Sequence, residues 1–364
     1  MICSIFRGCH PTPEEILLTK KTWKWVVAVA VLAALVSVAW LWLRNRGFDW
    51  AVFWATTAGL SWPWLSAALV LVMVSYLGRA LRWAVLMRPV KPHPSLGGLF
   101  SSTLIGFTAI TLLGRPGEFV RPYLISVRQR VPLSSQLAAL LLERIYDLLA
   151  ALVVFGFALS RVRHSEVHAG PALSWVLAVG GWAATAVGAA SLVVLVLIRQ
   201  YAEKMRLRLL DALRFVPARH HARVERLVTA FVQGVESTRS SVAVVQLIAY
   251  TVLEWVIIAG CLYAIVRAYG HLLLAFGVVD VMILLGFIAF GAVIQIPGIG
   301  GGVQVVSVLV LTELFHVPLE AATSVAMVSW FITFVAVVPV GVLLGLREGL
   351  NWSKLKSLEQ EVVP

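Results

Sequence analysis

Residues 242–266 read VAVVQLIAYTVLEWVIIAGCLYAIV, a predominantly apolar run whose single charged side chain is Glu254. A helix of about 20 apolar residues crosses a hydrocarbon core of about 30 Å. Because every backbone polar group in lipid must be paired within the structure, a continuous run of this kind predicts a membrane-spanning helix.

Similar runs recur along the whole chain of 364 residues, of which 60% are hydrophobic and 13% charged. A soluble domain carries about 25% charged residues. The sequence therefore predicts an all-α, polytopic integral membrane protein with about seven or eight transmembrane helices. The candidate spans are 24–43, 61–87, 134–160, 172–198, 242–266, 273–295 and 321–346.

The basic loop 199–241 fixes the expected orientation, because Lys and Arg collect on the cytoplasmic side of membrane proteins. We expect a cytoplasmic N-terminal tail (1–22), a transmembrane domain (23–347) that includes this loop, and a cytoplasmic C-terminal tail (348–364). The net charge of +12 then reflects basic loops near anionic lipid, and no nucleic-acid partner is expected. The cysteines and histidines form no metal-ligand spacing, so no metal or cofactor is expected.

Counting crossings along the chain identifies two segments that begin and end on the same side of the membrane. Residues 96–113 are one, predicted as a re-entrant hairpin broken near Gly106, and residues 273–316 contain the other. Paired interruptions in corresponding halves are typical of inverted repeats. The residues predicted to break the helices are Gly114, Gly117, Pro297, Gly298, Gly300 and Gly301.

Arg115, Glu118 and Arg121 follow each other at intervals of three residues, so on a helix they share one face. Pro116 and Gly117 interrupt the preceding helix and free backbone amides. Arginine beside free amides suits an anionic headgroup. The alternative is a charged turn in which the glutamate and an arginine merely pair.

Glu143, Arg144 and Asp147 lie within the apolar run 134–160, with Glu143 roughly 13 Å below the start of that helix at about 1.5 Å per residue. A charge at mid-bilayer costs on the order of 3 kcal/mol on insertion scales. These side chains must therefore pair and face a polar interior. They either line a path for a polar group or form an ion-pair cluster that holds helices together.

Arg79 and Arg82 lie toward the inner end of the run 61–87. Snorkelling of their charged ends to the headgroups is one explanation, and lining the same anionic site is the other. For Glu254, a structural hydrogen-bonded role and a role in a polar path are both open.

Three motifs resemble the transmembrane region of lysyl-phosphatidylglycerol synthases. They are Gly114-Arg115-Pro116-Gly117-Glu118 followed by Arg121-Pro122, Glu143-Arg144 followed by Asp147, and Pro297-Gly298-Ile299-Gly300-Gly301. The resemblance implies lipid flipping between leaflets and re-entrant segments. Gln304 and Trp330 stand where this family commonly has glutamate and arginine. The chain shows no aminoacyl-transferase domain, so we expect a stand-alone member.

We therefore expect a flippase-like lipid translocator of the inner, cytoplasmic membrane, with both termini cytoplasmic, and not an enzyme. Its substrate would be an anionic or aminoacylated phospholipid or a lipid-linked headgroup. A homo-oligomer and a separate lipid-synthesis enzyme are compatible partners. The alternatives are a membrane-embedded lipid-modifying enzyme and a non-transporting scaffold. The predicted substrate-binding residues are Arg79, Arg82, Arg115, Glu118, Arg121, Glu143, Arg144 and Asp147.

Overall fold

The computed structural model describes residues 47–163, 186–191, 240–292, 295–296 and 300–347, with single positions at 193, 197, 225 and 229. Almost all of these residues are helical, which confirms the all-α class. The elements are α2 (Trp50–Ala58), α3 (Trp62–Met87), α4 (Leu96–Leu113), η1 (Arg115–Phe119), α5 (Val120–Gln129), α6 (Leu133–Arg163), α9 (Ser241–Ala268), η4 (Gly270–Leu273), α10 (Val278–Gly291), β1 (Gln295–Ile296), β2 (Gly300–Gly301), α11 (Gly302–Glu313), α12 (Leu319–Trp330), η5 (Phe331–Val335) and α13 (Val338–Arg347).

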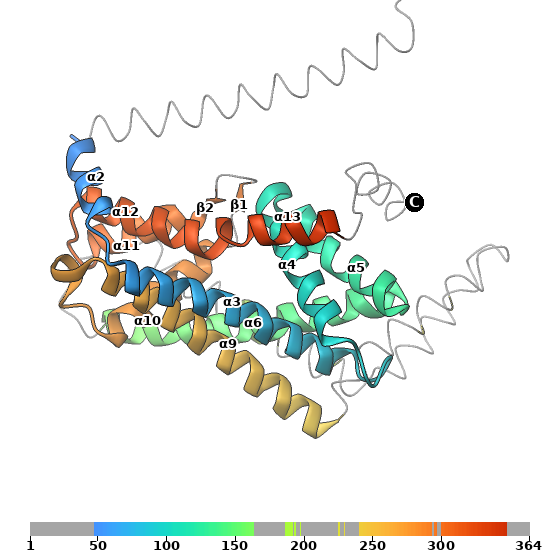
Figure 1. Cartoon of the computed structure of the whole chain (residues 1–364). Helices are drawn as coiled ribbons and strands as arrows, with labels where there is room; N and C mark the ends of the chain where they lie inside the picture. The colour runs from blue at the N-terminus through green and yellow to red at the C-terminus, as the bar shows by residue number, and fades with distance from the viewer. Residues whose placement is uncertain are drawn as a thin grey trace, which may run out of the picture. The chain divides into compact units, whose positions relative to one another are not determined.

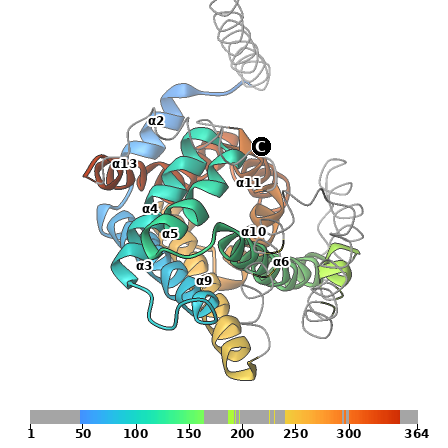
Figure 2. The ribbon, with the colours of Figure 1, turned by 90° about the vertical axis from the view of Figure 1, so that its right-hand side faces the viewer.

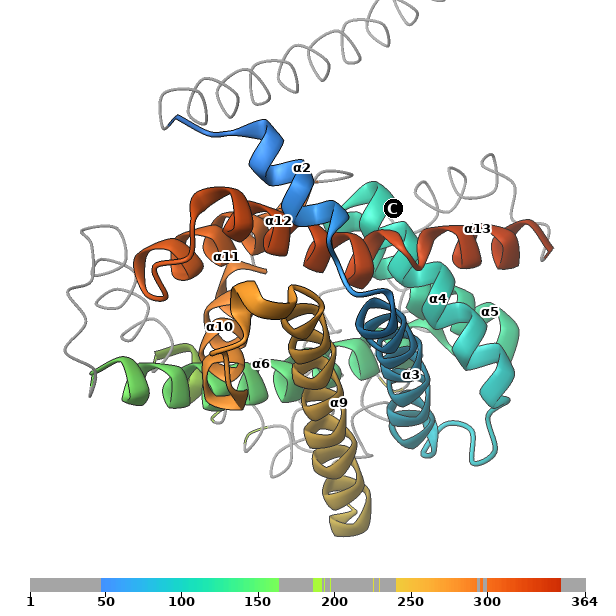
Figure 3. The same ribbon diagram turned by 60° about the vertical axis from the view of Figure 1, so that its left-hand side comes forward.

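The long apolar helices α3 and α9 lie side by side and antiparallel (Figures 1 and 3). The Ser61 amide donates to the Ala268 carbonyl over 2.9 Å, which joins the start of α3 to the end of α9. Ser240 caps α9 by accepting from the Ala243 amide. Within the described residues, α3, α4, α9 and the segment Leu319–Arg347 are long and apolar enough to cross a membrane.

The segment α4–η1–α5 is a helical hairpin (Figure 2). Its two ends are joined where the side-chain amide of Gln129 donates from Nε2 to the Ser95 carbonyl over 3.3 Å. Lys91 Nζ donates to the Gln129 side chain at the same place, over 2.9 Å. The predicted break near Gly106 is wrong, because α4 continues through Gly106 and ends at Gly114, whose φ of 71° suits glycine.

Two glycines allow the arms of this hairpin to pack closely. A Cβ atom on Gly106 would lie 2.5 Å from Arg121 Cβ, so Gly106 makes room for α5 and leaves α4 unbroken. A Cβ atom on Gly117 would lie 2.5 Å from the Ile110 amide nitrogen and closer still to the Ala109 carbonyl group. Gly117 therefore lets the turn lie directly on the end of α4.

A second hairpin is formed by α10 and α11, with the short antiparallel pair β1–β2 between them (Figure 1). A Cβ atom on Gly291 would lie 2.5 Å from the Gly302 carbonyl oxygen, so the arms approach at a pair of glycines. The prediction of a full span over 273–295 is wrong. Helix α10 begins at Val278 and ends at Gly291, about 21 Å at 1.5 Å per residue.

The last predicted span, 321–346, is divided in three parts. Helix α12 continues into η5, a π-helical turn, and then into α13, which packs against α4. A π-helical turn locally changes the direction of side chains on a helix. The predicted span 24–43, most of 172–198, nearly all of the loop 199–241, both tails, and Pro297 and Gly298 lie outside the described residues.

Candidate functional site

Six ionisable side chains from α3, α5, α6 and α9 meet inside the helical domain, and we call them the charged cluster: Arg79, Arg82, Arg121, Glu143, Asp147 and Glu254. They are three arginines and three acids, so their formal charges balance. Buried charges are tolerated when they are paired and hydrogen-bonded. This balance explains why charged residues are tolerated in otherwise apolar helices.

Arg82 is the centre of the charged cluster and is 0% exposed. Its guanidinium donates to Asp147 Oδ1 over 2.6 Å and to Glu143 Oε1 over 2.8 Å. It also donates to the Thr251 hydroxyl over 3.2 Å and lies 3.3 Å from Glu254 Oε2. Snorkelling is therefore the wrong explanation for Arg82, which joins α3 to α6 and α9.

Arg121 and Glu143 form a second buried contact, between α5 and α6. The Arg121 guanidinium lies 4.1 Å from the centroid of the Trp83 ring, which adds a cation–π interaction. Arg121 is 2% exposed and Glu143 is 1% exposed. This pair is sealed among side chains.

Arg79 and Glu254 form the outer part of the charged cluster, with 2.6 Å between Arg79 Nη2 and Glu254 Oε1. The Arg79 guanidinium also lies 4.7 Å from the centroid of the Phe107 ring. Glu254 is thus a member of an ion-pair network that sequence analysis did not assign to the site. Its signal was a carboxylate in the middle of an apolar helix.

A rim of three further charges, Arg115, Glu118 and Arg144, lies next to the cluster. Arg115 Nη1 donates to Glu118 Oε1 over 2.8 Å, and Arg144 Nε lies 3.4 Å from Glu118 Oε2. The side chains of Arg115 and Arg144 are 50% and 37% exposed, so both are partly accessible to a ligand.

A cavity of about 490 Å³ lies between the rim and the cluster, and we call it the charged cavity. Its charged lining residues are Arg79, Arg115, Glu118, Arg144, Asp147 and Glu254. Most other lining residues are apolar and come from α3, α4, α9, α10 and η5. The cavity thus combines a charged wall with apolar walls.

A family model described as the lysylphosphatidylglycerol synthase TM region matches residues 25–341. The chain belongs to this family. The family and the apolar helices together identify an integral membrane protein with a lipid-related role. The resemblance drawn from the three sequence motifs is confirmed, and the absence of a synthase domain stays a prediction.

One similar curated protein is the glycosyltransferase AglD of Haloferax volcanii, which is 31% identical over 100 residues. That match covers 26% of this chain and 16% of AglD, so the chain spans only a small part of its relative's length. No solved structure matches this chain.

The family motifs divide between the cavity wall and its support. Arg115, Glu118, Arg144 and Asp147 line the charged cavity, together with Arg79. The linings contain neither Arg121 nor Glu143 nor Arg82, which lie behind the wall. Arg121 departs from the face shared by Arg115 and Glu118 because the chain changes from a 3-10 turn to an α-helix at Val120.

Two residues of α12 also line the cavity, Ser329 and Trp330. Ser329 is 6% exposed, and its hydroxyl has no hydrogen-bond partner among the described residues. A buried hydroxyl without a partner is available to a ligand. The sequence carries no signal for Ser329, and Trp330 is marked only by its departure from the family pattern.

The turns of the two hairpins also meet at this cavity. Arg115 lies in the turn of the first hairpin, and Ala292 follows α10 in the second. Both residues line the cavity, as does Val303 at the start of α11. The breaks at Gly114 and Gly117 therefore place charged side chains beside the second hairpin.

Proposed function

We propose that this protein is a flippase-like lipid translocator that moves an anionic or aminoacylated phospholipid, or a lipid-linked headgroup, across the cytoplasmic membrane. The observation that carries the proposal is the charged cavity, which places six charged side chains beside apolar walls. Family membership supports a lipid substrate.

The physical problem of lipid transport is to carry a charged headgroup through hydrocarbon. A charged side chain at mid-bilayer costs on the order of 3 kcal/mol on insertion scales, and a headgroup phosphate meets the same dielectric barrier. In the proposed path, Arg115 and Arg144 bind the phosphate with planar guanidinium groups. Asp147 and Glu118 are placed to accept hydrogen bonds from an amine on the same headgroup.

In this proposal Arg82, Arg121 and Glu143 position the wall and do not touch the lipid. They hold α3, α5 and α6 together through buried ion pairs. Positioning by such a network keeps the lining side chains ready for the headgroup at low cost in conformational entropy.

We further propose that the two hairpins re-enter the membrane from opposite sides, with both chain termini in the cytoplasm. The closure of the first hairpin between Ser95 and Gln129 supports this arrangement, because it returns the chain to the end where α4 began. The excess of Lys and Arg in the loop 199–241 supports the orientation.

The test is transport of a fluorescent phosphatidylglycerol in proteoliposomes, measured by the fraction of label that a membrane-impermeant quencher reaches with time. The double variant Arg115→Gln/Arg144→Gln should lower the transport rate several-fold. Arg88→Gln is the matched control, because Arg88 is an exposed arginine that pairs with Gln246 outside the cavity. Equal rates in all three proteins and in protein-free vesicles would contradict the proposal.

The same vesicles test the two alternatives. A lipid-modifying enzyme would change the lipids, and chromatography of the extracted lipids would show the product. A scaffold would leave both the lipids and their leaflet distribution in the vesicles unchanged.

A further inference from the structure

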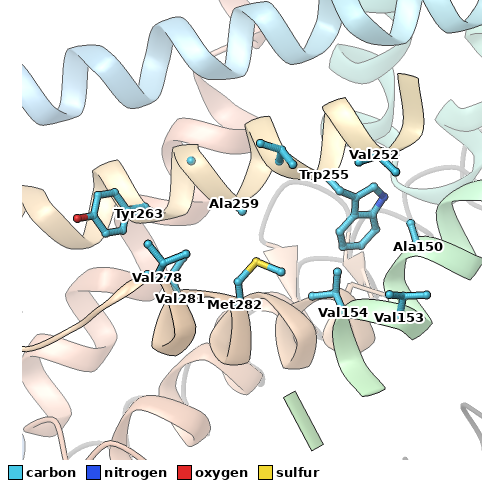
Figure 4. Close-up of a pocket in the computed structure, with 12 residues that line it drawn as sticks. Ala150, Val153, Val154, Val252, Trp255, Ala259, Tyr263, Val278, Val281 and Met282 are labelled. Carbon is cyan, nitrogen blue, oxygen red and sulfur yellow. The ribbon is translucent and has the colours of Figure 1, made fainter. Parts of the chain in front are cut away.

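A second cavity, here called the apolar groove, is bounded by α6, α9 and α10 (Figure 4). Its volume is about 540 Å³, and side chains such as Val153, Ala259 and Met282 line it. Tyr263 also lines the groove, and its hydroxyl accepts a 2.8 Å hydrogen bond from Arg267 Nε. A lining of this kind suits an apolar ligand.

The apolar groove adjoins the charged cavity. The same helices α6, α9 and α10 bound both spaces, and Trp255 lines both. On α6, Ala150 lines the groove and the neighbouring Ala151 lines the charged cavity. A single amphipathic molecule can therefore occupy both spaces, with its polar part in one and its apolar part in the other.

The length of the groove identifies the apolar part. Along α9 the groove extends from Val252 to Tyr263, which is about 16 Å at 1.5 Å per residue. Half of a hydrocarbon core of about 30 Å is about 15 Å. The groove is therefore as long as one acyl chain within a single leaflet.

We infer that the apolar groove binds one acyl chain of the lipid whose headgroup occupies the charged cavity, with Trp255 at the junction between chain and headgroup. The headgroup half of this inference rests on the proposed function. The groove explains how a lipid is held during transfer, since its chain stays in an apolar environment while its headgroup is bound by the rim.

The test is photolabelling of the full chain in vesicles of phosphatidylethanolamine and phosphatidylglycerol, the latter carrying a diazirine in one acyl chain. Adducts are mapped by mass spectrometry. We expect labelling of Trp255 and Met282 to exceed, several-fold, labelling of Val245. Val245 is the control because it is exposed on the same helix and lies outside both linings.

Two variants test the link to the headgroup. Arg115→Gln/Arg144→Gln should lower labelling of Met282 several-fold and leave Val245 unchanged. Ala259→Phe, which fills the groove, should do the same, whereas Val245→Phe should not. Uniform labelling along α9 would overturn the inference. Labelling of Met282 that is equally strong in the parent protein and in Arg115→Gln/Arg144→Gln would also overturn it.

The outcomes separate this inference from the proposed function. If Trp255 and Met282 are labelled selectively, and Arg115→Gln/Arg144→Gln lowers this labelling, but no lipid is transported, the proposed transport is rejected and the acyl-chain site in the groove is retained. If Arg115→Gln/Arg144→Gln lowers the transport rate but labelling is uniform along α9, the proposed transport is retained and the acyl-chain site in the groove is rejected.

Discussion

Arg115 donates a hydrogen bond from Nη2 to the carbonyl oxygen of Ala292 over 3.3 Å. This contact joins two hairpins whose residues are far apart in the sequence. It uses a carbonyl at the end of α10, where backbone acceptors lack helical partners. Because Arg115 also pairs with Glu118, one guanidinium connects the hairpin turns and the rim of the charged cavity.

The closure of the first hairpin predicts the sidedness of its ends. In a chain whose three cysteines are replaced, single cysteines at His93 and Arg130 should react with an impermeant maleimide from the same side of the membrane. Both positions are exposed and flank the hairpin. A cysteine at Leu272, beyond the end of α9, should react from the opposite side. Opposite labelling of His93 and Arg130 would reject re-entry.

Gly117→Ala should destabilise the protein by on the order of 1–3 kcal/mol, the usual cost of overpacking. The added methyl group would meet backbone atoms of Ala109 and Ile110, which cannot rotate away as a side chain can. Gly97→Ala is the matched control, since no atom lies within 4 Å of the added Cβ. Thermal unfolding in detergent should show a lower midpoint only for Gly117→Ala.

Arg82→Met should destabilise the protein by about 3–5 kcal/mol, because it leaves carboxylates buried with one counter-charge too few. Arg88→Met, at an exposed arginine, should stay within about 0.5 kcal/mol of the parent. Adding Asp147→Asn to Arg82→Met should recover part of the loss, since the charges then balance again. A double variant no more stable than Arg82→Met would disprove this explanation.

Gln304 illustrates how a departure from the family pattern is accommodated. Its side-chain oxygen accepts from the Gly301 amide over 2.7 Å and so caps α11. A glutamate can make the same hydrogen bond. Gln304→Glu should therefore preserve stability, whereas Gln304→Leu should cost about 1 kcal/mol. The neighbouring exposed Val305 provides the control variant Val305→Ala in the same unfolding measurement.

Several features of the site were readable from the sequence because their causes are local. The motif around Arg115 and Glu118 and the acidic residue Asp147 were predicted to serve one site, and the structure places all three in one cavity lining. The signal was charge at a Gly/Pro helix break for Arg115 and Glu118, and charge inside an apolar run for Asp147. Arg121 and Glu143 carried the same two signals and yet lie behind the wall. For Arg121 the reason is the helix geometry at Val120, which turns its side chain toward Trp83.

The sequence by itself determined the helical class, the helices α3 and α9 and the existence of two interrupted segments, since apolar length and Gly/Pro breaks act within a single element. Only the tertiary structure decided that α4 continues through Gly106, because Gly106 serves packing against α5. It also decided that Glu254 joins Arg79 and Arg82. Ion pairs between helices depend on which faces meet, and residue spacing along one helix does not contain that information.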